Sequence, residues 1–444
     1  MTDRTTADAD AEPRITPLAN GVRVVTLELP HLESACVSVF VRTGSVHETP
    51  ALSGISHVVE HMAFKGTATR NCQQINLDAE RLGAEVNAHT DKDHTAYHMR
   101  GLARDAGRFV QMLGDIVRNG SFPQDELERE RQVILQELAE DEDDAYSMAY
   151  RLFDKLCYGR HPLAQPVIGL RRNIERFTRD DLVAFVRRQQ SGANVVVAAA
   201  GRIDADAVVR AAEAAFGGMP RGNENRVPPP VWHGGFAARR MAGVSQSHVV
   251  LGFPVPPSTD PGHGVAVVAS ALFGEGMSSP LMDEIRERRG LVYYAACSTD
   301  ISDLAGQFVV EASMAPENVE TFASELVRLL RAQADAIDPV SLERARNQIA
   351  VRRLHVQERP YRRLEEAALD VFAFGRVRGR AERLERLMAV GTEPLRAEFA
   401  RMLQAPASIA IAGKVRPSAQ AHLKALPGLR LAGSGSELRA GAAA

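Results

Sequence analysis

The sequence is poor in the features that mark several large classes of protein. It has only four cysteines among 444 residues and no C-x-x-C pair, which excludes a disulfide-stapled scaffold and fits a reducing compartment. No apolar run reaches the roughly 18 residues that a membrane-spanning helix needs. Residues 1–12 carry four acidic side chains and resemble neither a secretory signal nor a transit peptide. We therefore expect a cytoplasmic protein with no membrane partner.

The chain also lacks a strong charge of either sign. Its 53 Lys and Arg against 56 Asp and Glu give a net charge of -3, so there is no overall basic field to attract nucleic acid. Hydrophobic residues make up 45% and charged residues 25%, which is typical of a globular protein with a sizeable core. At about 100 to 200 residues per domain, the length predicts two to four domains.

A change of composition divides the chain into nearly equal parts. Residues 217–243 are rich in glycine and proline and show no hydrophobic periodicity, which predicts a linker. It would separate an N-terminal domain, residues 1–216, from a C-terminal domain, residues 244–430. Residues 431–444 are small and polar, and we expect them to form a flexible tail.

The two halves resemble each other. Residues 127–134 (LERERQVI) align with residues 342–349 (LERARNQI) at an offset of 215, and each half closes with an apolar run that ends in glycine. Either match alone has about even odds of being chance. Two matches in the same order favour an internal duplication.

One motif carries a clear chemical meaning. In residues 53–64 (SGISHVVEHMAF) apolar residues recur at i, i+3, i+4 and i+7, which predicts a helix. His57 and His61 are one turn apart on it, a spacing at which two imidazoles can bind one Zn²⁺. Glu60 stands beside them, where a general base for a zinc-bound water would be. H-x-x-E-H arises by chance in roughly a few per cent of such sequences, so the hypothesis requires a third ligand.

Two glutamates on a later helix are candidates for that ligand. Residues 125–145 are predicted to be helical, and Glu130 and Glu137 project from within its apolar arc. The arc consists of Leu127, Val133, Ile134 and Leu138. Inward-facing carboxylates are costly unless they are paired or bound to metal. A buried salt bridge is the alternative and is favoured if the helix is taken alone; beside the histidine motif, a metal site is the better interpretation.

The second half offers an internal control for this hypothesis. At the offset of 215, Glu60 keeps an acidic counterpart in Glu275, but the four proposed metal-site residues do not. His57, His61, Glu130 and Glu137 correspond to Leu272, Gly276, Ala345 and Arg352. Joint loss of all four is expected if they serve one site.

These residues resemble a known family. Residues 57–67 (HVVEHMAFKGT) are similar to the catalytic segment of the pitrilysin, insulin-degrading enzyme and mitochondrial processing peptidase family, the inverted zincins of peptidase family M16. Residues 130–137 (ERQVILQE) are similar to the segment with its third ligand. The resemblance implies that Glu137 is the third ligand, that Glu130 supports the site, and that each chain holds one Zn²⁺. It also implies an α+β fold of two homologous domains, each a mainly antiparallel sheet backed by helices.

Two further segments share the resemblance. Residues 83–90 (GAEVNAHT) are similar to the family's active-site edge strand, which implies that Asn87 and Ala88 bind extended substrate through backbone hydrogen bonds. The segment from Arg286 to Tyr293 is similar to one whose Arg and Tyr reach the substrate beside the zinc, which implies catalytic roles for both. From the residues alone, a solvated arginine and an ordinary strand aromatic are the simpler interpretation. Tyr294 departs from the family, which usually has a small residue there, and would alter the pocket wall.

The combined prediction is a zinc metalloendopeptidase that hydrolyses extended or unfolded peptides, with Glu60 as general base. Long relatives have four such domains, so a two-domain chain would dimerise to build the same chamber. Because this chain has both the zinc motif and the Arg/Tyr segment, a homodimer is the simpler prediction, and a heterodimer with a related chain is the alternative. A non-catalytic subunit of the same fold is the rival function. The sequence specifies neither the peptides cut, nor a processing or degradative role, nor the metal loaded in the cell.

Overall fold

The computed structural model describes residues 12–431. The sequence-based interpretations of residues 1–11 and 432–444 lie outside this part of the chain. The described residues form two compact units. The first unit comprises residues 12–138, 165–227 and 354–382; the second unit comprises residues 139–164, 228–353 and 383–431.

The first unit is built on a six-stranded sheet with strand order β1-β2-β6-β3-β5-β4. Its strands are β1 (Arg14–Pro17), β2 (Arg23–Glu28), β3 (Ser34–Val41), β4 (Glu85–Thr90), β5 (Thr95–Leu102) and β6 (Val195–Gly201). Only β2 and β6 run parallel; the other neighbouring pairs are antiparallel. The prediction of a mainly antiparallel sheet is therefore confirmed.

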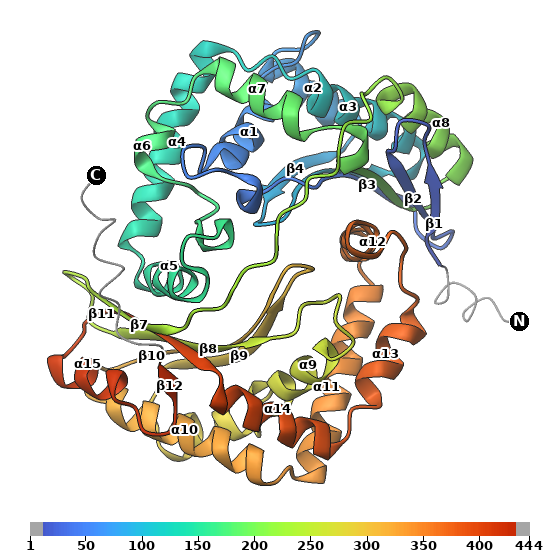
Figure 1. Cartoon of the computed structure of the whole chain (residues 1–444). Helices are drawn as coiled ribbons and strands as arrows, with labels where there is room; N and C mark the ends of the chain where they lie inside the picture. The colour runs from blue at the N-terminus through green and yellow to red at the C-terminus, as the bar shows by residue number, and fades with distance from the viewer. Residues whose placement is uncertain (1–11, 432–444) are drawn as a thin grey trace, which may run out of the picture. The chain divides into compact units, whose positions relative to one another are not determined.

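Helices cover both faces of this sheet (Figure 1). The helices of this unit are α1 (Ile55–Ala63), α2 (Cys72–Arg81), α3 (Ala106–Arg118), α4 (Gln124–Asp143), α6 (Arg171–Ile174), α7 (Arg179–Gln189), α8 (Ala205–Phe216) and α12 (Pro360–Phe374). Of these, α3 and α8 pack on one side of the sheet and α12 on the other. Short 3₁₀ segments occupy Ser45–His47, Ala103–Asp105 and Gly192–Asn194. The apolar strand β6 is buried along its whole length because alternate side chains enter two cores. One core includes α3 and α8, and the other includes α12.

The second unit repeats this plan. Its strands are β7 (Gly235–Arg240), β8 (Ser247–Val255), β9 (Tyr294–Ile301), β10 (Gly306–Met314), β11 (Pro406–Gly413) and β12 (Arg430–Leu431). The helical segments are α5 (Ala145–Tyr158), a 3₁₀ turn (Pro162–Ala164), α9 (His263–Gly274), the π-helix η5 (Met282–Arg288), α10 (Val319–Asp335), α11 (Pro339–Gln357), α13 (Arg380–Met388), α14 (Thr392–Gln404) and α15 (Pro417–Lys424).

The two sheets share one topology. The order β2-β6-β3-β5-β4 in the first unit matches β7-β11-β8-β10-β9 in the second. In both, the first pair is parallel and the remaining pairs are antiparallel. The expectation of two homologous halves is therefore confirmed at the level of the fold.

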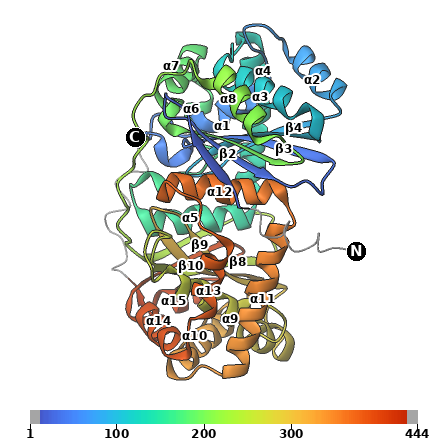
Figure 2. The same cartoon turned by 90° about the vertical axis from the view of Figure 1, so that its right-hand side faces the viewer.

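Each unit is completed by a helix from the opposite half of the sequence. Helix α5 packs on β11, β7 and β8, and Phe153 on it is fully buried. Helix α12 packs on β6, β3 and β2, with Leu364 fully buried (Figure 2). The compact units therefore differ from the predicted sequence domains, residues 1–216 and 244–430, whose boundaries stay a prediction. No helix in residues 12–431 is both long enough and apolar enough to span a bilayer.

Candidate metal centre

Helix α1 is held at its start by a buried carboxylate. Gly54 precedes the helix with φ of 100°, a conformation that favours glycine. The N–H groups of Gly54 and Ser56 donate to Glu48 at 2.7 and 2.8 Å, so Glu48 satisfies donors that the first helical turn leaves free. Burial raises the pKa of Glu48 to about 7, although these bonds oppose the shift. The apolar face of α1 packs against α4 and α7.

Three side chains from α1 and α4 converge. The Nε2 atoms of His57 and His61 lie 3.8 and 3.5 Å from the same oxygen, Oε2 of Glu137. The two imidazole rings are edge to face, with centroids 4.6 Å apart. Ligand atoms about 2.0 to 2.2 Å from a tetrahedral zinc lie about 3.3 Å from one another. The two nitrogens and one oxygen therefore suit one such ion after a small inward movement.

The electrostatics favour the form of His57 that binds metal. Burial and the neighbouring His61 ring lower the pKa of His57 to about 4. The ring is therefore neutral near pH 7, with a nitrogen lone pair for a cation.

Glu130 holds the second histidine from behind. Its Oε2 lies 3.0 Å from Nδ1 of His61, and its Oε1 lies 2.6 Å from Nζ of Lys65. Burial opposes ionisation of Glu130, but Lys65 and His61 outweigh it and lower its pKa. The ionised carboxylate accepts the Nδ1–H of His61, which leaves Nε2 free to face Glu137. The salt bridge that was the alternative for this helix thus exists at Glu130, and its partner is Lys65, which the sequence pattern does not single out.

Glu60 is half-buried beside this group. Burial raises its pKa, while a hydrogen bond from the Thr90 hydroxyl and the nearby His61 oppose the shift. A carboxylate with a raised pKa holds a transferred proton more firmly, which suits a general base.

Strand β4 forms one edge of the first sheet, and α1 packs against it (Figure 1). It carries Asn87 and Ala88. Within the described residues, β4 pairs only with β5, so its outer edge can accept an added strand. The Asn87 side chain accepts a hydrogen bond of 2.8 Å from the Ala88 N–H.

Arg286 and Tyr293 belong to the second unit. Arg286 is exposed on η5, with Nη1 3.5 Å from the sulfur of Met277. Tyr293 directly precedes β9 and is 63% exposed. The neighbouring Tyr294, which departs from the family pattern, donates a hydrogen bond of 2.7 Å to Glu311 on β10. The larger side chain is therefore anchored to the sheet of its own unit.

Within its described residues, the second unit has no comparable cluster. In residues 12–431, the groups of three or more close potential ligands both lie in the first unit. Gly276, the counterpart of His61 at an offset of 215, lies beyond the end of α9, so that offset does not align the two helices. Near the end of α9, Arg352 pairs with Glu275 at 2.9 Å instead.

Comparison with known proteins agrees with this geometry. Residues 23–170 match the model described as Insulinase (Peptidase family M16), and residues 176–349 match the Peptidase M16 inactive domain. A protein of Rickettsia bellii named "Uncharacterized zinc protease" is 30% identical over 401 residues, which cover 90% of this chain and 97% of the relative. The chain belongs to peptidase family M16. The resemblance in the sequence is thus confirmed.

Solved structures show the same M16 fold. A protease from Helicobacter pylori superposes with a TM-score of 0.84 at 22% identity, covering 90% of this chain and 99% of the other. A chain of complex III2 from Candida albicans gives a TM-score of 0.80 at 18% identity, covering 90% and 95%. The first M16 match spans His57, Glu60, His61, Glu130 and Glu137, whereas Arg286 and Tyr293 lie within the inactive-domain match.

Proposed function

We propose that this M16 protein is a zinc-dependent endopeptidase that hydrolyses extended or unfolded peptides. The observation that supports it most is that the Nε2 atoms of His57 and His61 lie 3.8 and 3.5 Å from one carboxylate oxygen of Glu137. These residues would hold one Zn²⁺ per chain. Zinc is the metal in the names of the relatives, and two imidazoles with a carboxylate are a frequent donor set for it.

When bound, zinc would lower the pKa of a water molecule and polarise the scissile carbonyl group. Glu60 takes the proton from the attacking water and returns it to the leaving amine. Its partly buried position and raised pKa support this role. Glu130, fixed by Lys65, keeps the His61 ring in the orientation that the site needs.

Substrate would add to the edge of the first sheet. Asn87 and Ala88 on β4 would contribute backbone hydrogen bonds to an extended peptide, and this mode of binding would favour unfolded chains. Tyr293, and Arg286 before it, would steady the oxyanion. Their exposure leaves both side chains available for a ligand.

A non-catalytic subunit, or one that needs a different chain, is the second candidate. The inactive-domain match to residues 176–349 favours it, but the intact group in the first unit favours an enzyme. We propose a homodimer because one chain carries both the metal group and the Arg286/Tyr293 segment. We also propose a cytoplasmic location, which the low cysteine content and the lack of a C-x-x-C pair in the sequence support.

The test is to purify the chain alone, measure bound metal by mass spectrometry, and incubate it with a mixed peptide library. We expect bound zinc, cleavage products inside the peptides, and a dimer by light scattering. A zinc-loaded, folded chain that cuts no peptide would support the non-catalytic candidate. Cleavage only after addition of a related chain would support the heterodimer.

A further inference from the structure

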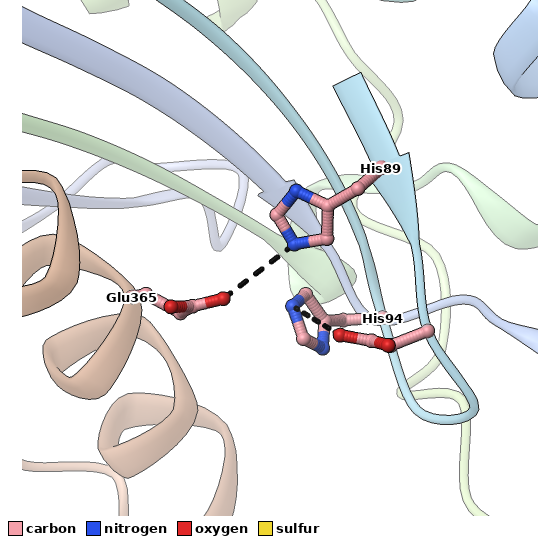
Figure 3. Close-up of side chains that lie close together, drawn as sticks. His89, His94 and Glu365 are labelled. Carbon is pink, nitrogen blue, oxygen red and sulfur yellow. Dashed lines mark ion pairs between the residues drawn. The ribbon is translucent and has the colours of Figure 1, made fainter. Parts of the chain in front are cut away.

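A second group of potential ligands lies in the first unit, on the turn that follows strand β4. It consists of His89 at the end of β4, Asp91 and His94 in the turn between β4 and β5, and Glu365 on α12. Figure 3 shows the His89 and His94 rings and the Glu365 carboxylate gathered between the turn and the helix. We propose that this group is a second site for a divalent transition metal, with a chemistry that suits zinc.

The distances are close to those of a metal site. One donor atom from each of the four residues lies within 4.8 Å of the others. Nε2 of His89 is 3.5 Å from Oε1 of Glu365, and Nε2 of His94 is 4.0 Å from Oδ2 of Asp91. The first of these separations equals the closest one at the His57/His61/Glu137 group, 3.5 Å. An ion could therefore draw the donors together with small side-chain rotations.

The ring nitrogen Nε2 of His94 is buried without a hydrogen bond in the part of the chain that the structure describes. The His94 side chain is buried, with 4% of its surface exposed, and its Nε2 has no hydrogen-bond partner within the described residues. A buried ring nitrogen without a partner is unusual because it loses its bond to water on folding. Its place in this group, facing carboxylates, points to a cation.

In both rings, Nδ1 lies close to an oxygen atom that can fix the orientation of the ring, as Glu130 does for His61. Nδ1 of His94 lies 2.7 Å from Oδ1 of Asp93, and Nδ1 of His89 lies 3.1 Å from the hydroxyl of Tyr361. If each Nδ1 carries the hydrogen and donates it to that oxygen, each Nε2 keeps its lone pair for a metal. This arrangement of an outer oxygen, an imidazole and a metal is general for histidine ligands.

Two imidazoles with carboxylates favour zinc and neighbouring transition metals over Ca²⁺ and Mg²⁺, which prefer oxygen ligands. The competing occupant of His94 is a proton. Burial opposes protonation, but the adjacent Asp93, with Asp91 and Glu365, outweighs it and raises the pKa of His94. Direct metal titration distinguishes the two occupants.

A metal here would join the β4–β5 turn to α12, a helix from the other half of the sequence. Glu365 is 271 positions after His94, so the ion would link segments that no local structure joins. Binding to the folded state alone raises thermal stability. This inference does not depend on the proposed peptidase activity.

The experiment removes the first group and titrates the second. The full chain carrying His57→Ala and His61→Ala is stripped with a chelator and titrated with Zn²⁺ by calorimetry, with bound metal measured after gel filtration. We expect about one zinc per chain and a melting temperature raised by about 5 °C at 100-fold excess over Kd. In that background, Glu365→Gln or His94→Asn should abolish both effects. The exposed His31 supplies the matched control, His31→Asn, which should retain them.

A second variant guards against misfolding of the double mutant. In the otherwise unchanged chain, Glu365→Gln should lower the zinc content by one equivalent. Asp93→Asn, which removes no ligand, should weaken binding by about 10- to 100-fold. A folded His57→Ala/His61→Ala chain that binds no zinc would overturn the proposal. So would zinc binding that survives both His94→Asn and Glu365→Gln.

Discussion

The two units have separate sheets of the same topology. They differ at the end of helix α1 in the first unit and at the end of helix α9 in the second. After α1, Lys65 pairs with Glu130 on α4; after α9, Glu275 pairs with Arg352 on α11. Each unit thus has an ion pair near the end of this helix, although Arg352 corresponds to Glu137 and not to Glu130 at the offset of 215. A group of close ligands, in contrast, is present only in the first unit among the described residues. In the second unit, α9, β9 and Arg352 line a cavity of about 460 Å³.

This difference separates what the fold requires from what the site requires. An ion pair can link the end of a short helix to a long helix whichever of the two carries the positive charge. The fold therefore does not require His57, His61 and Glu137. Their side chains are only partly buried, and packing alone does not call for them. The proposed chemistry is therefore assigned to the first unit, and variants at matched positions of the two units can test that assignment.

The largest expected effect is loss of the carboxylate at the centre of the first group. Glu137→Gln should lower zinc affinity and peptide hydrolysis by more than the 10- to 100-fold typical of an outer-shell partner. Arg352→Gln, on the long helix of the second unit, should change either by less than about 2-fold, since it touches no proposed ligand. Zinc content and hydrolysis of a fluorogenic peptide measure both. Equal losses of zinc and of hydrolysis in the two variants would contradict the assignment of the metal site to the first unit.

A smaller effect is expected from the residue that supports His61. Glu130→Gln keeps the shape of the side chain but removes the charge that holds Lys65 and His61. We expect zinc affinity to fall about 10- to 100-fold with the helix content unchanged. Competition with a coloured chelator measures the affinity, and circular dichroism supplies the folding control. An unchanged affinity would mean that the orientation of His61 does not depend on Glu130.

Helices α5 and α12 each pack on a sheet that comes mainly from the other half of the sequence. We expect substitutions in their buried faces to lower the stability of the two units by similar amounts. Leu364→Ala on α12 should destabilise the protein by about 2 to 5 kcal/mol, and Phe153→Ala on α5 by about 3 to 5 kcal/mol, because each removes a fully buried side chain. Denaturant unfolding followed by hydrogen exchange would assign each loss to a unit. If the amide protons lost their protection in the unit on which the helix does not pack, the assignment of α5 and α12 to their units would be contradicted.

The smallest effect is a pH dependence of the first unit. Burial and the nearby Arg42 lower the pKa of His47 to about 4, below its ordinary value of 6.5, and its Nδ1 accepts the Gly44 N–H at 3.2 Å. The unfolded chain takes up this proton near pH 6.5 and the folded chain only near pH 4. His47 therefore costs stability as the pH falls between these values, on the order of 2 kcal/mol.

The substitution His47→Asn should remove that cost. Glu48 has the opposite dependence, since its pKa is raised to about 7, so the comparison with the unchanged chain isolates His47. Melting temperatures at pH 7 and pH 5 should show a smaller acid-induced decrease for the variant. Parallel decreases in the two proteins would show that His47 is not the group responsible.

The sequence predicted features that depend on local spacing. The helix with His57 and His61 follows from apolar periodicity, and the antiparallel sheets follow from the family resemblance. The apolar arc of α4 was correct for Leu127, Ile134 and Leu138 but wrong for Val133, which is 45% exposed. Periodicity describes a stripe along a helix, whereas the actual edge of the core depends on which neighbours cover it.

Features made by distant segments could not be predicted from the sequence. Glu48 at the start of α1 and Glu365 beside His94 are ordinary glutamates until the fold brings them to their partners. The one available signal was the density of histidines at positions 89, 94 and 98 in a chain with only 13. The packing of α5 and α12 on sheets from the other half of the sequence likewise cannot be recognised from the spacing of hydrophobic residues.

The most direct test of the central claim is a paired measurement of zinc content and peptide hydrolysis in Glu60→Gln. Glu60 stands beside the metal group without being one of its three donors. We expect the zinc content to equal that of the unchanged chain while turnover falls by about 10²- to 10⁴-fold, the usual contribution of a general base. Undiminished turnover with zinc fully bound would contradict the assignment of Glu60 and the mechanism built on it.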